Sequence, residues 1–290
     1  MSVIMDYECA AGGESGLSAA EIRELGLAFP DAHRQKDAMK TLSLALKEKE
    51  ASRFCELPFC HTLEAESMGG KINFGDETNG PRAAEYIASK IEDILALPDI
   101  DYTKGRMREA LSAALELSQA GETVLLSVSG PLTILNALID SKYVFRAMRK
   151  EPDLTRRVFR KIERELIRYL AEAEKRGVRI VSYADPTAGV RILGPKLTEW
   201  YVDEFAYPFL KNVSSKFGRN LLIALCPKVT FALIGVDKAE FAEVYPVGAV
   251  PYGDALACLI GKETFVGHIC VKNKRQILTD GTIKTIRLNA

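Results

Sequence analysis

The chain has 290 residues, of which 47% are hydrophobic and 27% are charged. This is the balance of an ordinary globular protein with enough apolar material for a large core. Because 39 basic and 39 acidic side chains cancel, no overall charge draws the chain to nucleic acid or to anionic lipid. We therefore expect a small-molecule or protein partner.

The N-terminal part of the sequence is predicted to be helical. Ser18 and Glu21 have the spacing of a capping box, and the apolar residues that follow recur at helical intervals. Residues 55–75 instead combine a proline, a histidine, glutamates and three glycines, which indicates a shaped loop with short strands. Helices are predicted at residues 31–50, 81–95, 103–120, 132–150, 154–176, 196–217 and 254–260.

Short apolar strands alternate with these helices. The order of strand, loop, helix and strand favours parallel βα units, and strands that are apolar nearly throughout are typical of sheets covered on both faces. Without a Pro/Gly/Ser-rich linker, residues 1–290 are predicted to form one domain, and residues 275–288 a hairpin around Asp280-Gly281. The strands are predicted at residues 123–128, 178–183, 221–225 and 264–271.

The expected cellular compartment decides how the cysteines are interpreted. No basic segment followed by an apolar run opens the sequence, and the apolar stretches are too short to cross a bilayer, so we expect a cytoplasmic protein. In such a protein cysteines are thiols or metal ligands rather than a disulfide framework. The six lie at positions 9, 55, 60, 226, 258 and 270.

Polar residues gather where the predicted strands end, and in parallel α/β folds function collects at these ends. Cys226 follows one strand, and His268 and Cys270, two residues apart, share a face near the end of another. Two thiolates and an imidazole from adjacent strand ends would form a zinc site with one open coordination position, as catalytic zinc sites have. Asp185, before a proline at a strand end, and Glu64, beside His61 in the unusual loop, are candidate pocket residues.

Each candidate also has a structural interpretation. A single cysteine is usually a small buried apolar residue, and an Asp-Pro pair commonly forms a turn. Glu64 and Glu66 fit a solvated surface equally well. The run of charges from Arg156 to Arg168 fits a solvated helix face and indicates no nucleic-acid site.

Several motifs together resemble the uroporphyrinogen decarboxylase superfamily, especially its branch of methylcobamide:thiol (coenzyme M) methyltransferases. The resemblance runs from about residue 55 to residue 235. It rests on residues 57–66 with 68–70 and 73–76, on Ser129-Gly-Pro-Leu-Thr133, on Ala184-Asp-Pro-Thr-Ala188 with Leu193-Gly-Pro195, and on Leu225-Cys-Pro-Lys228.

The resemblance implies an α/β fold: a distorted (β/α)8 TIM-type barrel, here with extra N-terminal helices and a shortened C-terminal part. It also implies that zinc activates a thiol for methyl transfer to or from a corrinoid carried by a partner protein. The family's first zinc histidine is Ala224 here, so our hypothesis is that His268 and Cys270 complete the site with Cys226.

The remaining roles and the alternatives follow from the same comparison. Asp185 and Glu64 would orient a small-molecule methyl donor or acceptor or manage its proton, assisted by His61. Porphyrinogen decarboxylation is the weaker enzyme interpretation, since no arginine-rich segment precedes residue 55. A non-catalytic protein that binds a corrinoid or a thiol is the alternative outside the enzymes.

Overall fold

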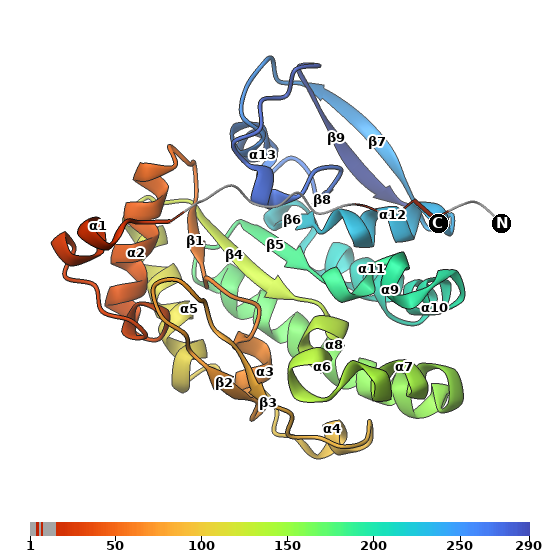
Figure 1. Ribbon diagram of the computed structural model, residues 1–290. Helices are drawn as coiled ribbons and strands as arrows, with labels where there is room; N and C mark the ends of the chain where they lie inside the picture. The colour runs from red at the N-terminus through yellow and green to blue at the C-terminus, as the bar shows by residue number, and fades with distance from the viewer. Residues whose placement is uncertain (1–3, 6, 8–15) are drawn as a thin grey trace.

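A central sheet of seven strands organises the molecule (Figure 1). The structure, a computed structural model, describes residues 4, 5, 7 and 16–290. The strand order is β1-β4-β5-β6-β8-β9-β7, in which the first five strands are parallel and the last two pair antiparallel. The strands are β1 (Cys55–Leu57), β4 (Val124–Ser129), β5 (Ile180–Ala184), β6 (Leu222–Leu225), β8 (Phe265–Val266), β9 (Thr282–Leu288) and β7 (Ala239–Pro246).

This arrangement confirms the α/β class. The five parallel strands lie side by side in chain order, as the strands of a TIM-type barrel do. In the part of the chain that the structure describes, no strand pairing joins β1 to β7. Among the same residues, no helix is long and apolar enough to cross a membrane.

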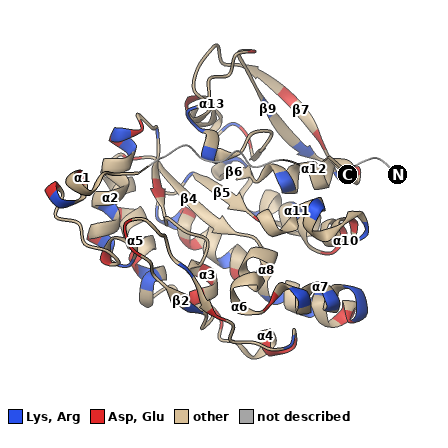
Figure 2. Cartoon of the chain, viewed as in Figure 1, with Lys and Arg blue, Asp and Glu red and all other residues tan. Residues whose placement is uncertain are grey.

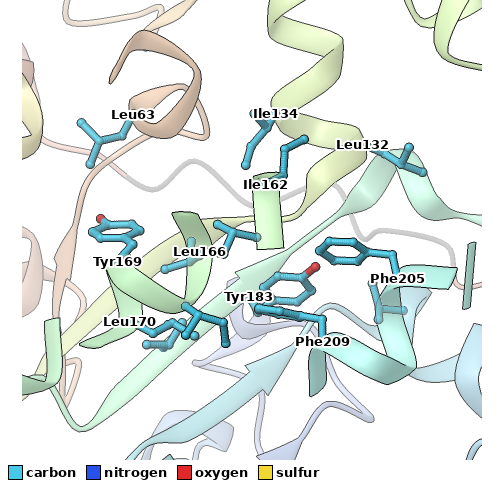
Figure 3. Close-up of a cluster of buried hydrophobic side chains, with 14 of the residues drawn as sticks. Leu63, Leu132, Ile134, Ile162, Leu166, Tyr169, Leu170, Tyr183, Phe205 and Phe209 are labelled. Carbon is cyan, nitrogen blue, oxygen red and sulfur yellow. The ribbon is translucent and has the colours of Figure 1, made fainter. Parts of the chain in front are cut away.

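Four helices that precede parallel strands cover one face of the sheet. Every second side chain of a strand points to the same face, so Val124, Leu126 and Val128 of β4 all point toward these helices. Figure 3 shows part of the resulting core, where Ile162, Leu166 and Leu170 of one long helix lie near Tyr183 and the rings of Phe205 and Phe209. The helices are α2 (Lys36–Lys49), α5 (Gly105–Gln119), α8 (Pro152–Lys175) and α11 (Tyr207–Phe217).

Shorter elements connect these layers. The predicted capping box is confirmed, with the Ser18 hydroxyl accepting from the Glu21 amide and the Glu21 carboxylate accepting from the Ser18 amide. The connecting elements are α1 (Ala19–Glu24), α3 (Leu63–Ser67), the hairpin β2 (Lys71–Asn73) and β3 (Arg82–Glu85), α4 (Asp93–Ala96), α6 (Pro131–Leu138), α7 (Ser141–Lys150), α9 (Val190–Leu193), α10 (Pro195–Tyr201), η3 (Val202–Ala206), α12 (Pro227–Gly235), α13 (Tyr252–Leu259) and η5 (Val271–Asn273).

The structure corrects three predicted elements. The helix at 81–95 is wrong, because β3 pairs there with β2 and only α4 is helical. The strand predicted at 264–271 is shorter in the structure, where only β8 is extended. At Gly267 the chain passes so close to Leu225 that any side chain would collide with it, and the chain then turns. The predicted C-terminal hairpin is also wrong, because β9 pairs with β7 and β8 instead of folding back on residues 275–279.

The helix α13 covers the other face of the sheet. Leu256 and Leu259 of α13 pack in a second apolar cluster with Leu125, Ile180 and Leu222 of the parallel strands. This cluster fills the face that would line the interior of a closed barrel, so that face is packed rather than hollow.

Ion pairs join the C-terminal part of the chain, which includes α13, to residues in and just before β1. The Lys274 ammonium lies 2.8 Å from the Glu50 carboxylate and 2.5 Å from that of Glu56, and its side chain is only 12% exposed. Arg53 contacts Asp254 of α13 at 2.7 Å. Side-chain pairs therefore join the C-terminal part to the β1 edge of the sheet.

The packing of α13 on the sheet predicts that shortening a buried leucine of α13 destabilises the protein more than shortening an exposed leucine elsewhere. Leu256 is 0% exposed and Leu44 is 40% exposed. Leu256→Ala should lower the free energy of unfolding by about 2–4 kcal/mol, because it leaves a cavity, whereas Leu44→Ala should change it by less than about 1 kcal/mol. Urea unfolding followed by circular dichroism measures both, and equal costs would contradict the packing of α13 on the sheet.

Candidate functional site

The loops that follow the parallel strands meet at one edge of the sheet, because parallel strands end on the same side. Residues 58–62 follow β1, Gly130 follows β4 and Asp185 follows β5. Cys226 follows β6, and residues 267–270 follow β8. All six predicted site residues lie on or beside these loops.

Glu64 ties the loop after β1 to the end of β4. The Ser129 amide donates to its Oε1 at 2.7 Å and the Ser129 hydroxyl to its Oε2 at 2.9 Å. The Glu64 side chain is almost completely buried, and burial raises its pKa. The carboxylate thus has two donors from one residue and is closed off from solvent.

Asp185 has a still more complete set of partners. Its Oδ1 accepts from the Thr133 amide at 2.8 Å and hydroxyl at 2.7 Å, and its Oδ2 from the Leu132 amide at 3.2 Å and the Tyr201 hydroxyl at 2.8 Å. Burial raises the pKa of Asp185 to about 6, against the lowering effect of these bonds. A Cβ at Gly130 would lie 2.4 Å from the Asp185 Cβ, so only glycine fits there. Asp185 therefore fixes the first turn of α6 against β5 and α10.

Arg106, in the first turn of α5, organises the loop after β1 in a way that the sequence does not reveal. Its side chain is 2% exposed. Its Nε donates to Glu66 at 2.6 Å, and its two terminal nitrogens donate to the Thr62 hydroxyl at 2.8 Å and to Cys60 Sγ at 3.2 Å. These partners are 40 or more positions away in the chain, so no local pattern predicts the cluster.

His61 lies in the same loop and is neutral near pH 7. Burial, followed by the charge of Lys272, lowers its pKa to about 4. Its Nδ1 is buried and has no hydrogen-bond partner among the described residues. Since Lys272 belongs to η5, the influence of its charge places the imidazole toward the segment that follows β8.

The three predicted zinc ligands lie at the ends of two neighbouring strands. Ala224 of β6 pairs with Val266 of β8, and Cys226 and His268 each follow two residues later. The His268 ring meets Tyr252 edge-on, with the ring centroids 5.6 Å apart. Burial and then the charge of Lys284 lower its pKa.

In the part of the chain that the structure describes, these side chains are not grouped as a metal centre. The Cys270 amide donates to the Tyr7 hydroxyl at 3.4 Å. Of the residues whose placement is described, no three His, Cys, Asp or Glu side chains are grouped so that they could hold a metal ion. The ligand set Cys226, His268 and Cys270 therefore stays a prediction.

Two surface cavities lie away from the predicted residues. One, of about 570 Å³, is bordered by α2 and Asp254, and the other, of about 510 Å³, lies between the first turns of α2 and α5. Neither is lined by Asp185, Glu64 or His61, nor by the predicted zinc ligands.

Comparison with known proteins gives one family. Residues 12–233 match the model of the family described as Uroporphyrinogen decarboxylase (URO-D). The methylcobamide:CoM methyltransferase MtaA of Methanosarcina barkeri is 25% identical over 221 residues, which cover 75% of this chain and 64% of MtaA. The methylcobamide:CoM methyltransferase MtbA of Methanosarcina acetivorans is 22% identical over 219 residues, covering 73% of this chain and 63% of MtbA.

Two further matches extend this picture. A uroporphyrinogen decarboxylase of Myxococcus xanthus is 26% identical over 161 residues, covering 53% of this chain and 44% of that protein. The solved structure of a methyltransferase from Methanosarcina mazei superposes with a TM-score of 0.65 at 23% identity, over 76% of this chain and 66% of that one, which establishes a shared fold. The chain thus spans just under two thirds of the length of the methyltransferases MtaA and MtbA.

The contacts of Asp185 predict a structural effect of its removal. Asp185→Ala would leave four buried or partly buried donors without this acceptor, so it should lower the free energy of unfolding by about 2–5 kcal/mol. Tyr201→Phe removes a single donor and should cost about 1 kcal/mol. Thermal and urea unfolding measure both. A stable but inactive Asp185→Ala variant would instead favour the predicted contact between Asp185 and substrate.

Proposed function

Because the chain belongs to the uroporphyrinogen decarboxylase family, we propose that it is a methyltransferase that moves a methyl group between a corrinoid and a small thiol. The main support is that the relatives MtaA and MtbA, named as methylcobamide:CoM methyltransferases, align over about three quarters of this chain. The family match includes Glu64, Asp185 and Cys226. The corrinoid would be delivered by a partner protein.

The reaction requires one substitution at carbon. The thiol sulfur forms a bond to the methyl carbon, the cobalt–carbon bond breaks with its electron pair left on cobalt, and the thiol proton goes to a base. We propose His61 as the acceptor because its Nδ1 has no partner among the described residues. Since burial lowers its pKa to about 4, the imidazole would pass the proton on to solvent rather than hold it. Glu64 and Asp185 act in this proposal by holding the loops after β1, β4 and β5 in fixed positions.

Zinc would lower the pKa of a bound thiol and so supply the thiolate. We assign no step to it here, because the described side chains do not form a three-ligand group. The ligand set Cys226, His268 and Cys270 is kept as a separate proposal, supported by the position of all three at the ends of neighbouring strands.

The two alternatives differ in their support. Porphyrinogen decarboxylation is disfavoured because no arginine-rich segment precedes residue 55. A non-catalytic corrinoid- or thiol-binding protein is favoured by the burial of Glu64 and Asp185, whose oxygens are already engaged.

The proposal predicts turnover with free methylcobalamin and coenzyme M. Loss of the methyl–cobalt absorbance should accompany the formation of methyl-coenzyme M, measured by mass spectrometry. His61→Gln should lower the rate at least tenfold through loss of the base, whereas His33→Gln, at a buried histidine of η1 (Asp31–His33), should change it about twofold at most. Binding of both substrates without any methyl-coenzyme M would point to the non-catalytic alternative.

The zinc proposal predicts a metal content that depends on Cys226. Purified protein and the Cys258→Ala variant, altered at an exposed cysteine, should each hold about one zinc per chain, and Cys226→Ala should lose it. Elemental analysis after removal of loosely bound metal measures this. Equal zinc in all three proteins would remove Cys226 from the ligand set.

A further inference from the structure

One face of the helix α7 carries an unusual concentration of positive charge. The exposed residues of α7 are Lys142, Tyr143, Arg146, Arg149 and Lys150. At about 100° per residue their positions fall within an arc of about 120°, so all five lie on the same side of the helix. This set is called the α7 face below. Figure 2 shows its blue segments at the margin of the molecule.

Most of these charges have no ion-pair partner among the described residues. Lys142 pairs with Asp140 at 3.0 Å, but Arg146, Arg149 and Lys150 make no ion pair with any described residue. The acids that follow the helix include Asp153, which pairs with Arg156. In a chain whose basic and acidic residues are equal in number, three unpaired cations on one helix face form a local positive field.

Two tyrosines accompany the charges. Tyr143 is 39% exposed, and Tyr86, which follows β3, is 53% exposed. Lys142 lies over the Tyr143 ring at 4.9 Å and is within electrostatic reach of the Tyr86 hydroxyl. Exposed tyrosine together with arginine is the composition of protein–protein contact surfaces.

The α7 face lies beside the edge at which the parallel strands end. α6 begins directly after β4, and α7 follows α6 and packs against α8, which leads back to β5. α8 has 24 residues and is about 36 Å long, far longer than the five residues of β5. The start of α8, with α7 beside it, therefore extends past the strand ends (Figure 1).

We propose that the α7 face is the docking surface for an acidic face of the protein that carries the corrinoid. This rests on the proposed function, because methyl transfer brings a protein-bound corrinoid to the loops at the strand ends. An acidic protein fits better than a membrane, since Val144, Ala147 and Met148 of α7 are buried against the core and leave no apolar side for insertion. Charge complementarity of this kind speeds association and weakens with salt.

The test compares two triple charge reversals of the full chain. Arg146→Glu/Arg149→Glu/Lys150→Glu alters the α7 face. Lys211→Glu/Lys216→Glu/Arg219→Glu changes the net charge equally on and after α11, where the exposed cations also lack ion pairs among the described residues. Each protein is immobilised and exposed to extract of the source cells, and retained corrinoid protein is measured as cobalt. Vesicles of phosphatidylglycerol serve as the lipid probe, and turnover of free methylcobalamin is measured in parallel.

We expect wild-type protein and the α11 variant to retain cobalt and the α7 variant to retain at least tenfold less. The wild-type signal should fall between 0.1 and 0.5 M salt, following the screening of charges. Thermal unfolding checks that the variants are folded. Turnover of free methylcobalamin should stay within about twofold in both variants, because a free corrinoid needs no docking surface.

Several results would overturn the proposal. They are equal cobalt retention by wild type and the α7 variant, equal loss in both variants, no retention by wild type, or binding that depends on α7 with vesicles alone. If α7-dependent cobalt retention occurs without any turnover of free methylcobalamin, the docking surface stands and the proposed methyltransferase activity fails.

Discussion

A single buried carboxylate determines how the strand-end edge of this protein is built. Asp185 accepts four hydrogen bonds, from the first turn of α6 and from Tyr201 of α10. These donors lower its pKa, yet burial outweighs them and leaves the pKa raised to about 6. An ionisable group is retained here because no apolar residue could satisfy the amides at the start of α6. The direction of α6, and through it the position of α7, depends on this contact.

Glu64 and Arg106 fix the loop after β1, at the same edge of the sheet. Glu64 joins α3 to the end of β4, and Arg106 holds the loop around Cys60 and Thr62 against α5. His61 belongs to the same loop, and burial keeps its ring neutral near pH 7. Charged groups thus provide the rigidity of the loops, while a neutral imidazole is left for chemistry.

The C-terminal part of this chain lies beyond the family match. The family match ends at Leu233 within α12, and the structure beyond it consists of β7, α13, β8 and β9. In this part α13 covers the inner face of the sheet, and Lys274 joins the end of the chain to Glu50 and Glu56. The inner face of the sheet is therefore filled by apolar side chains, and the polar candidate residues lie at the strand ends.

The amino-acid sequence by itself determined the α/β class, the parallel order of the strands, the family, and the position of Asp185, Cys226 and His268 at or near strand ends. These features follow from local patterns of apolar residues and turns, which act within a few positions along the chain. The sequence also named Glu64, although as a substrate contact rather than as the partner of Ser129.

Only the tertiary structure decided which segments meet. The Arg106 cluster, the cover of α13 and the pairing of β9 with β7 each join residues that are about 40 or more positions apart. The hairpin β2–β3 likewise replaced a predicted helix, because pairing between strands outweighs helix propensity. A local pattern carries no information on such partners, since their free energy comes from burial and hydrogen bonds that exist only after the chain has folded.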